Sequence, residues 1–182
     1  MPRKLTISSV KATARAQKDV IAELRQYGCW TESLAQLKVR HSWCSWSYGY
    51  QRYGGDGDIV IPMLSGSRLV EQFSNCRYVS LRDVLRHEYA HGIAYCHNHL
   101  VSKRLFTKVF GAPHDSDQTV AYCDQSHVTA YAANHPMEDF AEVFMYFLKY
   151  KGKLPRRWSG FQRIVKKWKY IESLCRKLRR MN

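Results

Sequence analysis

The pentapeptide His87-Glu88-Tyr89-Ala90-His91 constrains this chain more than any other segment, because its two histidines can act together only on a helix. Ser80, with Asp83 three residues later, has the form of a capping box and predicts a helix from Leu81 to about Asn98. Residues four apart lie one above the other on a helix, so both imidazoles can reach one Zn²⁺ at about 2.0–2.1 Å. The segment therefore predicts a zinc-binding helix with both histidines, His87 and His91, as ligands.

Glu88 stands beside these two ligands in the position of a general base. Zinc lowers the pKa of a bound water toward ~7, and a neighbouring carboxylate can take the proton and later deliver it to a leaving amine. The alternative is a chance pentapeptide in a histidine-rich chain, but a chance match need not have fallen on a capped helix. The pattern thus favours peptide hydrolysis by a zinc-bound water that Glu88 activates.

A catalytic zinc of this kind takes a third protein ligand and keeps its fourth position for water. Glu138 and Glu142 are four residues apart on a second expected helix, which Pro136 begins. We interpret Glu138 as the third ligand and Glu142 as the acceptor of the free N–H of His87, which fixes the orientation of that ring. The preference of helix N-termini for acids explains Asp139, but it does not explain two glutamates at ligand spacing.

The two segments together resemble the bacterial zinc-binding metallopeptidases of the zincin-like clan, of the gluzincin type. The matching residues are His87-Glu88-x-x-His91 and Tyr131-Ala132-x-x-x-Pro136-x-Glu138-Asp139-Phe140-Ala141-Glu142-x-Phe144. The spacing of the tyrosine and the two glutamates is also similar to that in the catalytic domain of anthrax lethal factor. The resemblance implies that Glu138 binds zinc and that Tyr131 stabilises the tetrahedral intermediate. It covers roughly Leu81 to Tyr150, with an edge strand at Ile59 to Ile61.

His97 competes with Glu138 for the place of third ligand. It follows His87 by ten residues, the spacing of the third histidine in the pattern HExxHxxGxxH. Ala94, however, occupies the position of the glycine at which that pattern turns the chain, and alanine is costly where φ must be positive. We therefore prefer Glu138. The remaining candidates are expected to be loop histidines, one of which could serve as a second oxyanion donor: His99, His114, His127 and His135.

The chain of 182 residues predicts one α+β domain of zincin-like architecture. Residues 1–79 are expected to form an N-terminal helix, from Ser8 or Ser9 to Gly28, and a small twisted sheet packed on the active-site helix. The sheet would contain two strands, within Leu37–Tyr53 and at Ile59–Ile61, joined by a glycine-rich hairpin. Pro62 favours an edge position for the second strand, along which an extended substrate would pair beside Ile59.

Residues 80–150 would hold the catalytic helices, with Phe140, Phe144 and Phe147 facing the core, and residues 151–182 a basic amphipathic helix. From Lys149 onward there are thirteen Lys or Arg and one acid, so 13 − 1 = +12 of the formal charge of +14 lies there. Such a concentration can attract nucleic acid or an anionic surface, or it can simply be a solvated helix face.

Cysteine usage and apolar patterning indicate the compartment. Six cysteines without a CxxC pair predict mostly free thiols in a reducing environment, and the lone His41-x-x-Cys44 lacks the second half of a structural zinc site. No transmembrane segment and no secretory signal is evident. We therefore expect a cytoplasmic protein, or one exported by a route without a conventional signal peptide.

Three functional hypotheses follow. The first is a zinc metalloendopeptidase that cleaves a protein or peptide substrate. The second is a nucleic-acid-associated protein, with the zincin-like domain active on bound proteins or serving as an inactive binding module. The third is a toxin or effector protease that uses the basic helix to find a partner.

Overall fold

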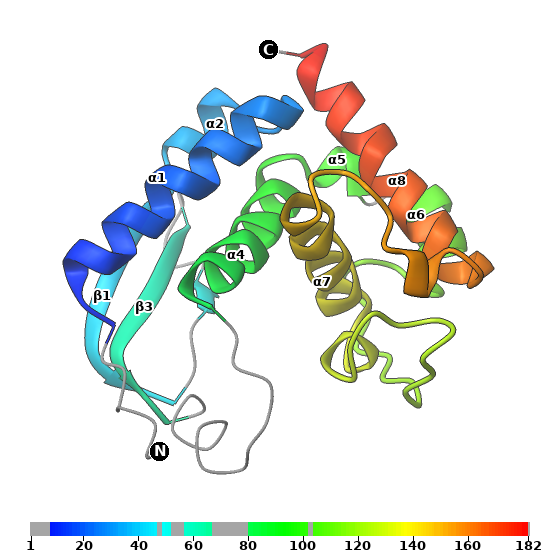
Figure 1. Cartoon of the computed structure of the whole chain (residues 1–182), viewed down its shortest axis with the longest axis horizontal. Coiled ribbons are helices and arrows are strands. Elements are labelled where there is room, and N and C mark those ends of the chain that lie inside the picture. Colours follow the sequence, from blue (N-terminus) through cyan, green and yellow to red (C-terminus); the bar gives the residue numbers. More distant parts are fainter. Residues whose placement is uncertain (1–7, 47–48, 52–56, 67–79, 102–103, 182) are drawn as a thin grey trace.

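The computed structural model describes residues 8–46, 49–51, 57–66, 80–101 and 104–181, and these form a mostly helical α+β arrangement (Figure 1). The α-helices are α1 (Val10–Tyr27), α2 (Glu32–Ala35), α4 (Leu81–Cys96), α5 (Asn98–Val101), α6 (Arg104–Phe110), α7 (Pro136–Lys149) and α8 (Gln162–Arg179). Two short 3-10 helices are η1 (Tyr131–Ala133) and η2 (Arg156–Trp158). The strands are β1 (Lys38–Ser45), β2 (Gly49–Gln51) and β3 (Asp58–Ser65).

The four long helices lie where the sequence predicts them, although α4 ends at Cys96, two residues before the expected Asn98. The Ser9 side chain accepts the N–H of Ala12 at the start of α1, and Gly28 ends that helix with φ +72°, which favours glycine. Ser80 caps α4, which extends through Ala94 to Cys96. Pro136 occupies the first turn of α7, and the expected tail helix is α8. These four predictions from the sequence are confirmed.

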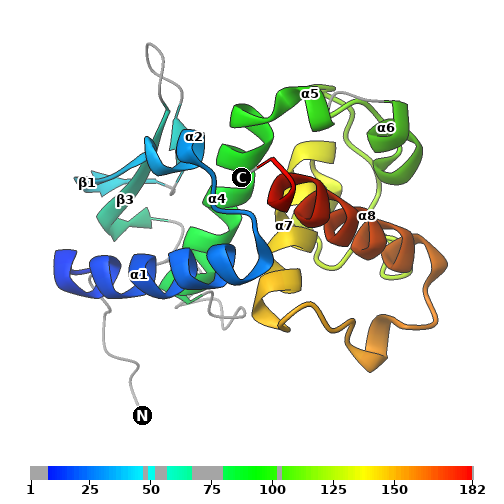
Figure 2. The same cartoon turned by 90° about the horizontal axis from the view of Figure 1, so that it is seen from above.

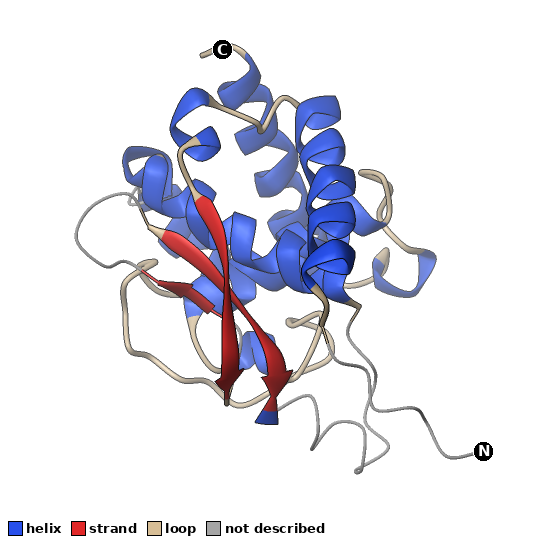
Figure 3. Ribbon diagram, turned by 90° about the vertical axis from the view of Figure 1, so that its left-hand side faces the viewer, coloured by secondary structure: helices blue, strands red, loops and turns tan. Residues whose placement is uncertain are grey.

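The three strands form one sheet in the order β1-β3-β2, on one side of the helices (Figure 3). β2 and β3 are antiparallel, as a hairpin requires, but the longer strand β1 pairs parallel to β3. The prediction of a single hairpin of two strands is therefore wrong in part. The expected turn residues Gly54 and Gly55 lie outside the described residues. The central position of β3 agrees with the full burial of Ile59 and Ile61, whereas no residue of β1 is buried.

The expected edge position of the strand that contains Ile59 is also wrong, because Ile59 pairs with Val39 on one side and with Tyr50 on the other. A substrate cannot add to β3 there. Pro62 is tolerated because the pairing with β2 covers only Asp58 to Val60, so no ladder hydrogen bond to β2 is lost at the proline. The edge that adjoins the helical body is instead β2, which contacts α4.

Helices α4 and α7 lie side by side at the centre of the molecule, with α1 against α4 and α8 across α7 (Figure 2). Phe140 and Phe144 of α7 are fully buried and Phe147 is nearly so, as predicted. The apolar side of α8 closes the same core through Ile164, Trp168 and Leu178. α8 is therefore part of the hydrophobic core. No described helix is both long and apolar enough to cross a membrane.

Candidate metal centre

The site lies where one polar face of α4 meets one polar face of α7. Successive turns of α4 present Asp83, His87 and His91, and all three are buried. They face α7 in antiparallel order: Lys149 contacts Asp83, Glu142 contacts His87, and Glu138 contacts both histidines. The spacing of four residues along α4, and of four and then seven along α7, is what brings these side chains into register.

Three possible ligand atoms converge at the N-terminal end of α7. The Nε2 atoms of His87 and His91 are 3.0 Å apart, and Glu138 Oε2 lies 3.0 Å from the first and 3.5 Å from the second. Among the described residues these three side chains make up the one group of His, Cys, Asp or Glu whose ligand atoms lie close enough to hold a metal ion. His41 and Cys44 belong to no such group.

This donor set fits zinc. Four ligands at about 2.0–2.1 Å in a tetrahedron stand about 3.3 Å from one another, close to the three separations seen here. Two imidazoles and a carboxylate are also the protein ligands of a known type of catalytic zinc site, which leaves one position for water. The residues present therefore could bind a metal ion without rearrangement of the helices.

Glu142 and Thr129 hold the ring of His87 in place. Glu142 Oε1 lies 2.9 Å from His87 Nδ1, as the sequence predicted, and the Thr129 hydroxyl donates to Glu142 Oε2 at 2.7 Å. In the neutral ring that a metal ion requires, an Nδ1–H donated to Glu142 would leave the Nε2 lone pair directed toward His91 and Glu138. Thr129 was not predicted, because it lies in a loop and belongs to no motif in the sequence.

The electrostatics of the cluster favour positive charge at its centre. Burial lowers the pKa of His87, but hydrogen bonds to Glu138 and Glu142 and the charge of Glu88 outweigh it and raise the pKa to about 10. Burial alone would raise the pKa of Glu138. The hydrogen bonds from Glu138 to the two histidines outweigh burial and hold the pKa of Glu138 well below its usual value. A proton or a metal ion is thus strongly attracted to this position.

Glu88 and Tyr131 border the three possible ligands. Glu88 is buried beside His87, and its negative charge acts on both His87 and Tyr131. Tyr131 is 52% exposed, and its ring centroid lies 5.8 Å from that of His87. Burial of its hydroxyl end, followed by the charges of Glu138 and Glu88 and a hydrogen bond to Glu138, raises the pKa of Tyr131. Tyr131 is therefore a neutral hydrogen-bond donor at the rim of the cluster.

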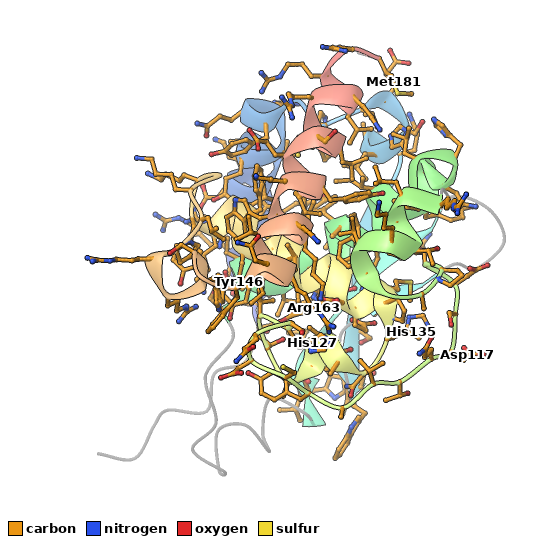
Figure 4. All side chains as sticks on the ribbon, turned by 90° about the vertical axis from the view of Figure 1, so that its right-hand side faces the viewer. Asp117, His127, His135, Tyr146, Arg163 and Met181 are labelled. Carbon is orange, nitrogen blue, oxygen red and sulfur yellow. The ribbon has the colours of Figure 1, made fainter. Side chains whose placement is uncertain are left out.

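His97 lies elsewhere. It ends α4, and its Nε2 is 3.0 Å from the Thr31 hydroxyl, so it is not part of the group of possible ligands. Of the loop histidines, His114 is the one whose pKa is affected by His91 as well as by burial, and it is lowered to about 4. His127 and His135 lie on the face that carries α6 and α8 (Figure 4). His135 caps α7, and His127 contacts Cys123.

Asp139 and Lys167 are buried together. The sequence had indicated only a favourable helix-dipole position for Asp139 and a solvent-exposed basic helix face for the lysines of the tail. Asp139 Oδ2 and Lys167 Nζ are 2.5 Å apart and both residues are buried, so Lys167 joins α8 to α7 at the residue that follows Glu138 in the chain. The helical spacing of Trp168 and Ile171 predicts a buried face for α8, but it does not tell which lysine lies at its border. Lys167 is therefore not available to a ligand.

Comparisons with protein-family models, with curated proteins and with solved structures found no match to this chain. The possible metal site consequently stands on its own geometry.

Proposed function

We propose that this chain is a zinc-dependent endopeptidase of the gluzincin type, built as a single zincin-like domain. The observation that carries the proposal is the convergence of His87, His91 and Glu138 on one point, with Glu88 buried beside it. The resemblance of the two motifs to zincin-like metallopeptidases agrees with this arrangement. A zinc ion at that point would act as a Lewis acid toward water and toward a substrate carbonyl.

The side chains divide the remaining work. Glu88 accepts the proton of the attacking water and returns it to the leaving amine. Tyr131 donates a hydrogen bond to the oxygen of the scissile carbonyl as it gains negative charge, a task that a neutral phenol performs without a counter-ion. Glu142, held by Thr129, keeps the His87 ring in its binding orientation. On this proposal a base, a donor and an oriented ligand lie together where α4 meets α7.

The substrate would bind as an extended strand against β2. This strand contacts α4, and among the described residues only β3 is paired with it. Main-chain hydrogen bonds to a strand edge orient a peptide without requiring a particular sequence, so we expect cleavage within unfolded or extended segments.

The direct test is a peptidase assay with an unfolded protein and a peptide mixture as substrates. Zinc-loaded protein should yield new peptide termini, a chelator should stop the reaction, and added zinc should restore it. A folded protein that binds zinc and produces no new termini under these conditions would exclude the peptidase and leave a metal-binding module.

A second candidate function is association with nucleic acid or another polyanion. Its basis is the exposed side of α8, which carries Lys166, Lys169 and Arg176 along one row. Deleting the tail cannot test it, because the opposite side of α8 is core. Replacement of these three residues by Gln should instead weaken binding to a DNA duplex and flatten its salt dependence. The matched control removes Lys11, Arg15 and Lys18 from the exposed side of α1; equal effects would indicate charge alone.

A further inference from the structure

Two buried cysteines lie in contact at a point far from the metal centre. Cys29 follows the end of α1 and Cys175 is on α8, and they are 0% and 4% exposed. Their sulfur atoms are 2.8 Å apart. Non-bonded carbon atoms stay at about 3.5–4.0 Å and sulfur is larger, so this separation is too short for two thiols at rest. It is within a small movement of the roughly 2.0 Å of a disulfide bond.

The surrounding contacts hold the two sulfur atoms in this position. Gly28 permits the close approach, because a Cβ there would stand 2.6 Å from Arg179 Cβ, one turn beyond Cys175. The Arg179 guanidinium donates to the Gln26 carbonyl at 3.1 Å. Figures 1 and 2 both place the last turns of α8 beside the end of α1. The two helix segments are therefore fixed together independently of the sulfur atoms.

α8 is also fixed along the rest of its length. The indole N–H of Trp168 donates to the Gly152 carbonyl, the Tyr170 hydroxyl donates to the Leu100 carbonyl, and Lys167 pairs with Asp139. A bond between sulfur atoms that the fold already holds together adds little strain to the native state. This distinguishes the pair from Cys44 and Cys123, which are exposed.

We propose that Cys29 and Cys175 form a structural disulfide when the chain folds in the presence of a small-molecule disulfide such as oxidised glutathione. The thiolate of one cysteine attacks the glutathione disulfide and releases one glutathione thiolate. The other cysteine, as thiolate, then attacks the mixed disulfide and releases the second glutathione. Two protein thiols are oxidised and one glutathione disulfide is reduced to two thiols, so atoms and electrons balance.

The proposed bond belongs to folding and not to a switch in the finished protein. Both sulfur atoms are inaccessible, and the contact with Cys175 together with burial raises the pKa of Cys29, so the native thiols react slowly. The bond would close a loop of 146 residues between the end of α1 and the C-terminal helix. The separation along the chain makes the restriction of the unfolded state large.

The experiment uses the full chain with Cys44 and Cys123 replaced by Ser, refolded with a mixture of oxidised and reduced glutathione. Peptide mapping without reductant should show Cys29 linked to Cys175, and the oxidised form should melt about 5–15 °C above the reduced one. Cys175→Ala should fold, remove the linked peptide and abolish this difference. Four cysteines remain in this variant, so a bond between Cys29 and Cys175 leaves two free thiols, those of Cys76 and Cys96. Four free thiols in the refolded protein, or a different pairing, would overturn the proposal. Addition of the same mixture to protein already folded should form the bond far more slowly; an equal rate would also contradict it.

Discussion

Two charged clusters are centred on buried residues of α4 one turn apart, and they differ in how their charges are balanced. The ion-pair cluster contains Glu23, Asp83, Arg86 and Lys149. Arg86 is bonded to both Glu23 oxygens at 2.7 and 2.6 Å and to Asp83 at 2.6 Å, and Lys149 lies 2.6 Å from Asp83. Two permanent cations thus neutralise two carboxylates, and each carboxylate has a permanent partner. Such a cluster joins α1, α4 and α7 and requires nothing else.

The histidine cluster contains His87, His91, Glu138 and Glu142, with Glu88 beside it. Together with Glu88 it has three carboxylates, and it has no permanent cation among its members, so burial of this unpaired charge is costly. Either protons or a metal ion must supply the missing positive charge. The comparison teaches that the balance of charge, more than burial or proximity, separates a structural cluster from a site that needs a ligand. The predictions below test this difference.

The largest expected effect is that of Glu88→Gln. The change removes the base and keeps the shape, so turnover should fall about 10²–10⁴-fold while zinc remains bound. Peptide cleavage and metal content are measured on the same sample. Glu23→Gln in the ion-pair cluster is the control, and it should lower stability and leave turnover per folded molecule unchanged. Turnover near wild type in Glu88→Gln would remove Glu88 from the mechanism.

Tyr131→Phe should have the next largest effect. Loss of one donor to a developing oxyanion commonly costs about 2.7–4 kcal/mol, which is a fall of about 10²–10³ in kcat with little change in KM. Phenylalanine keeps the ring against His87, so stability and zinc content should be unchanged. Full turnover in a stable, zinc-loaded variant would show that the tyrosine only packs at the rim of the histidine cluster.

Glu142→Gln should weaken zinc binding without abolishing it. The partner that orients a ligand histidine typically contributes about 10–100-fold in metal affinity. Competition with a coloured chelator measures the affinity, and Glu172→Gln, on the exposed side of α8, is the matched control. An affinity equal to that of wild type would mean that the contact with His87 is structural only, like those in the ion-pair cluster.

The smallest functional effect should come from Lys149→Met, which breaks a pair in the ion-pair cluster. Stability should fall by about 1–3 kcal/mol, while zinc content and turnover per folded molecule stay the same. Urea unfolding measures the loss, and Lys153→Met is the exposed control. A loss of zinc in the Lys149 variant would show that the two clusters are not separate.

The pH dependence of stability should also reveal the ion pair between Asp83 and Lys149. Burial favours the neutral form of Asp83, but Lys149 and Arg86 outweigh it and lower the pKa of Asp83. The stabilisation is present above the pKa of an unfolded carboxyl, ~3.9, and is lost as the pH falls through the lower folded value. The difference in stability between wild type and Lys149→Met should therefore shrink on acidification. A difference that grows would contradict the assigned sign.

Helices could be predicted from the sequence because their signals are local. Ser9 and Ser80 cap the first turns of α1 and α4, Gly28 ends α1, and Pro136 begins α7. Each signal lies within a few residues of the turn that it affects. The grouping of His87, His91 and Glu138 could also be predicted, since the spacing of four places the members of each motif on one helix face. The packing of α4 against α7, which joins the two motifs, came from a family resemblance and not from spacing.

What could not be predicted depends on contacts between distant segments. Strand order is such a case: the apolar run at Ile59 fits a hairpin strand as well as a central strand, and only the pairing with both β1 and β2 decides. The same is true of Thr129, Lys167 and the pair Cys29 and Cys175. Each is an ordinary residue in the sequence, and its partner lies many residues away in the chain.

Zinc content tests the central claim most directly. Purified protein is reconstituted with zinc, freed of excess metal and analysed as wild type, Glu138→Ala and His97→Ala, with circular dichroism to confirm that each is folded. Wild type and His97→Ala should retain about one zinc per chain, and Glu138→Ala should retain far less. A folded wild-type protein without zinc, or a loss of zinc in His97→Ala but not in Glu138→Ala, would contradict the assignment of this site.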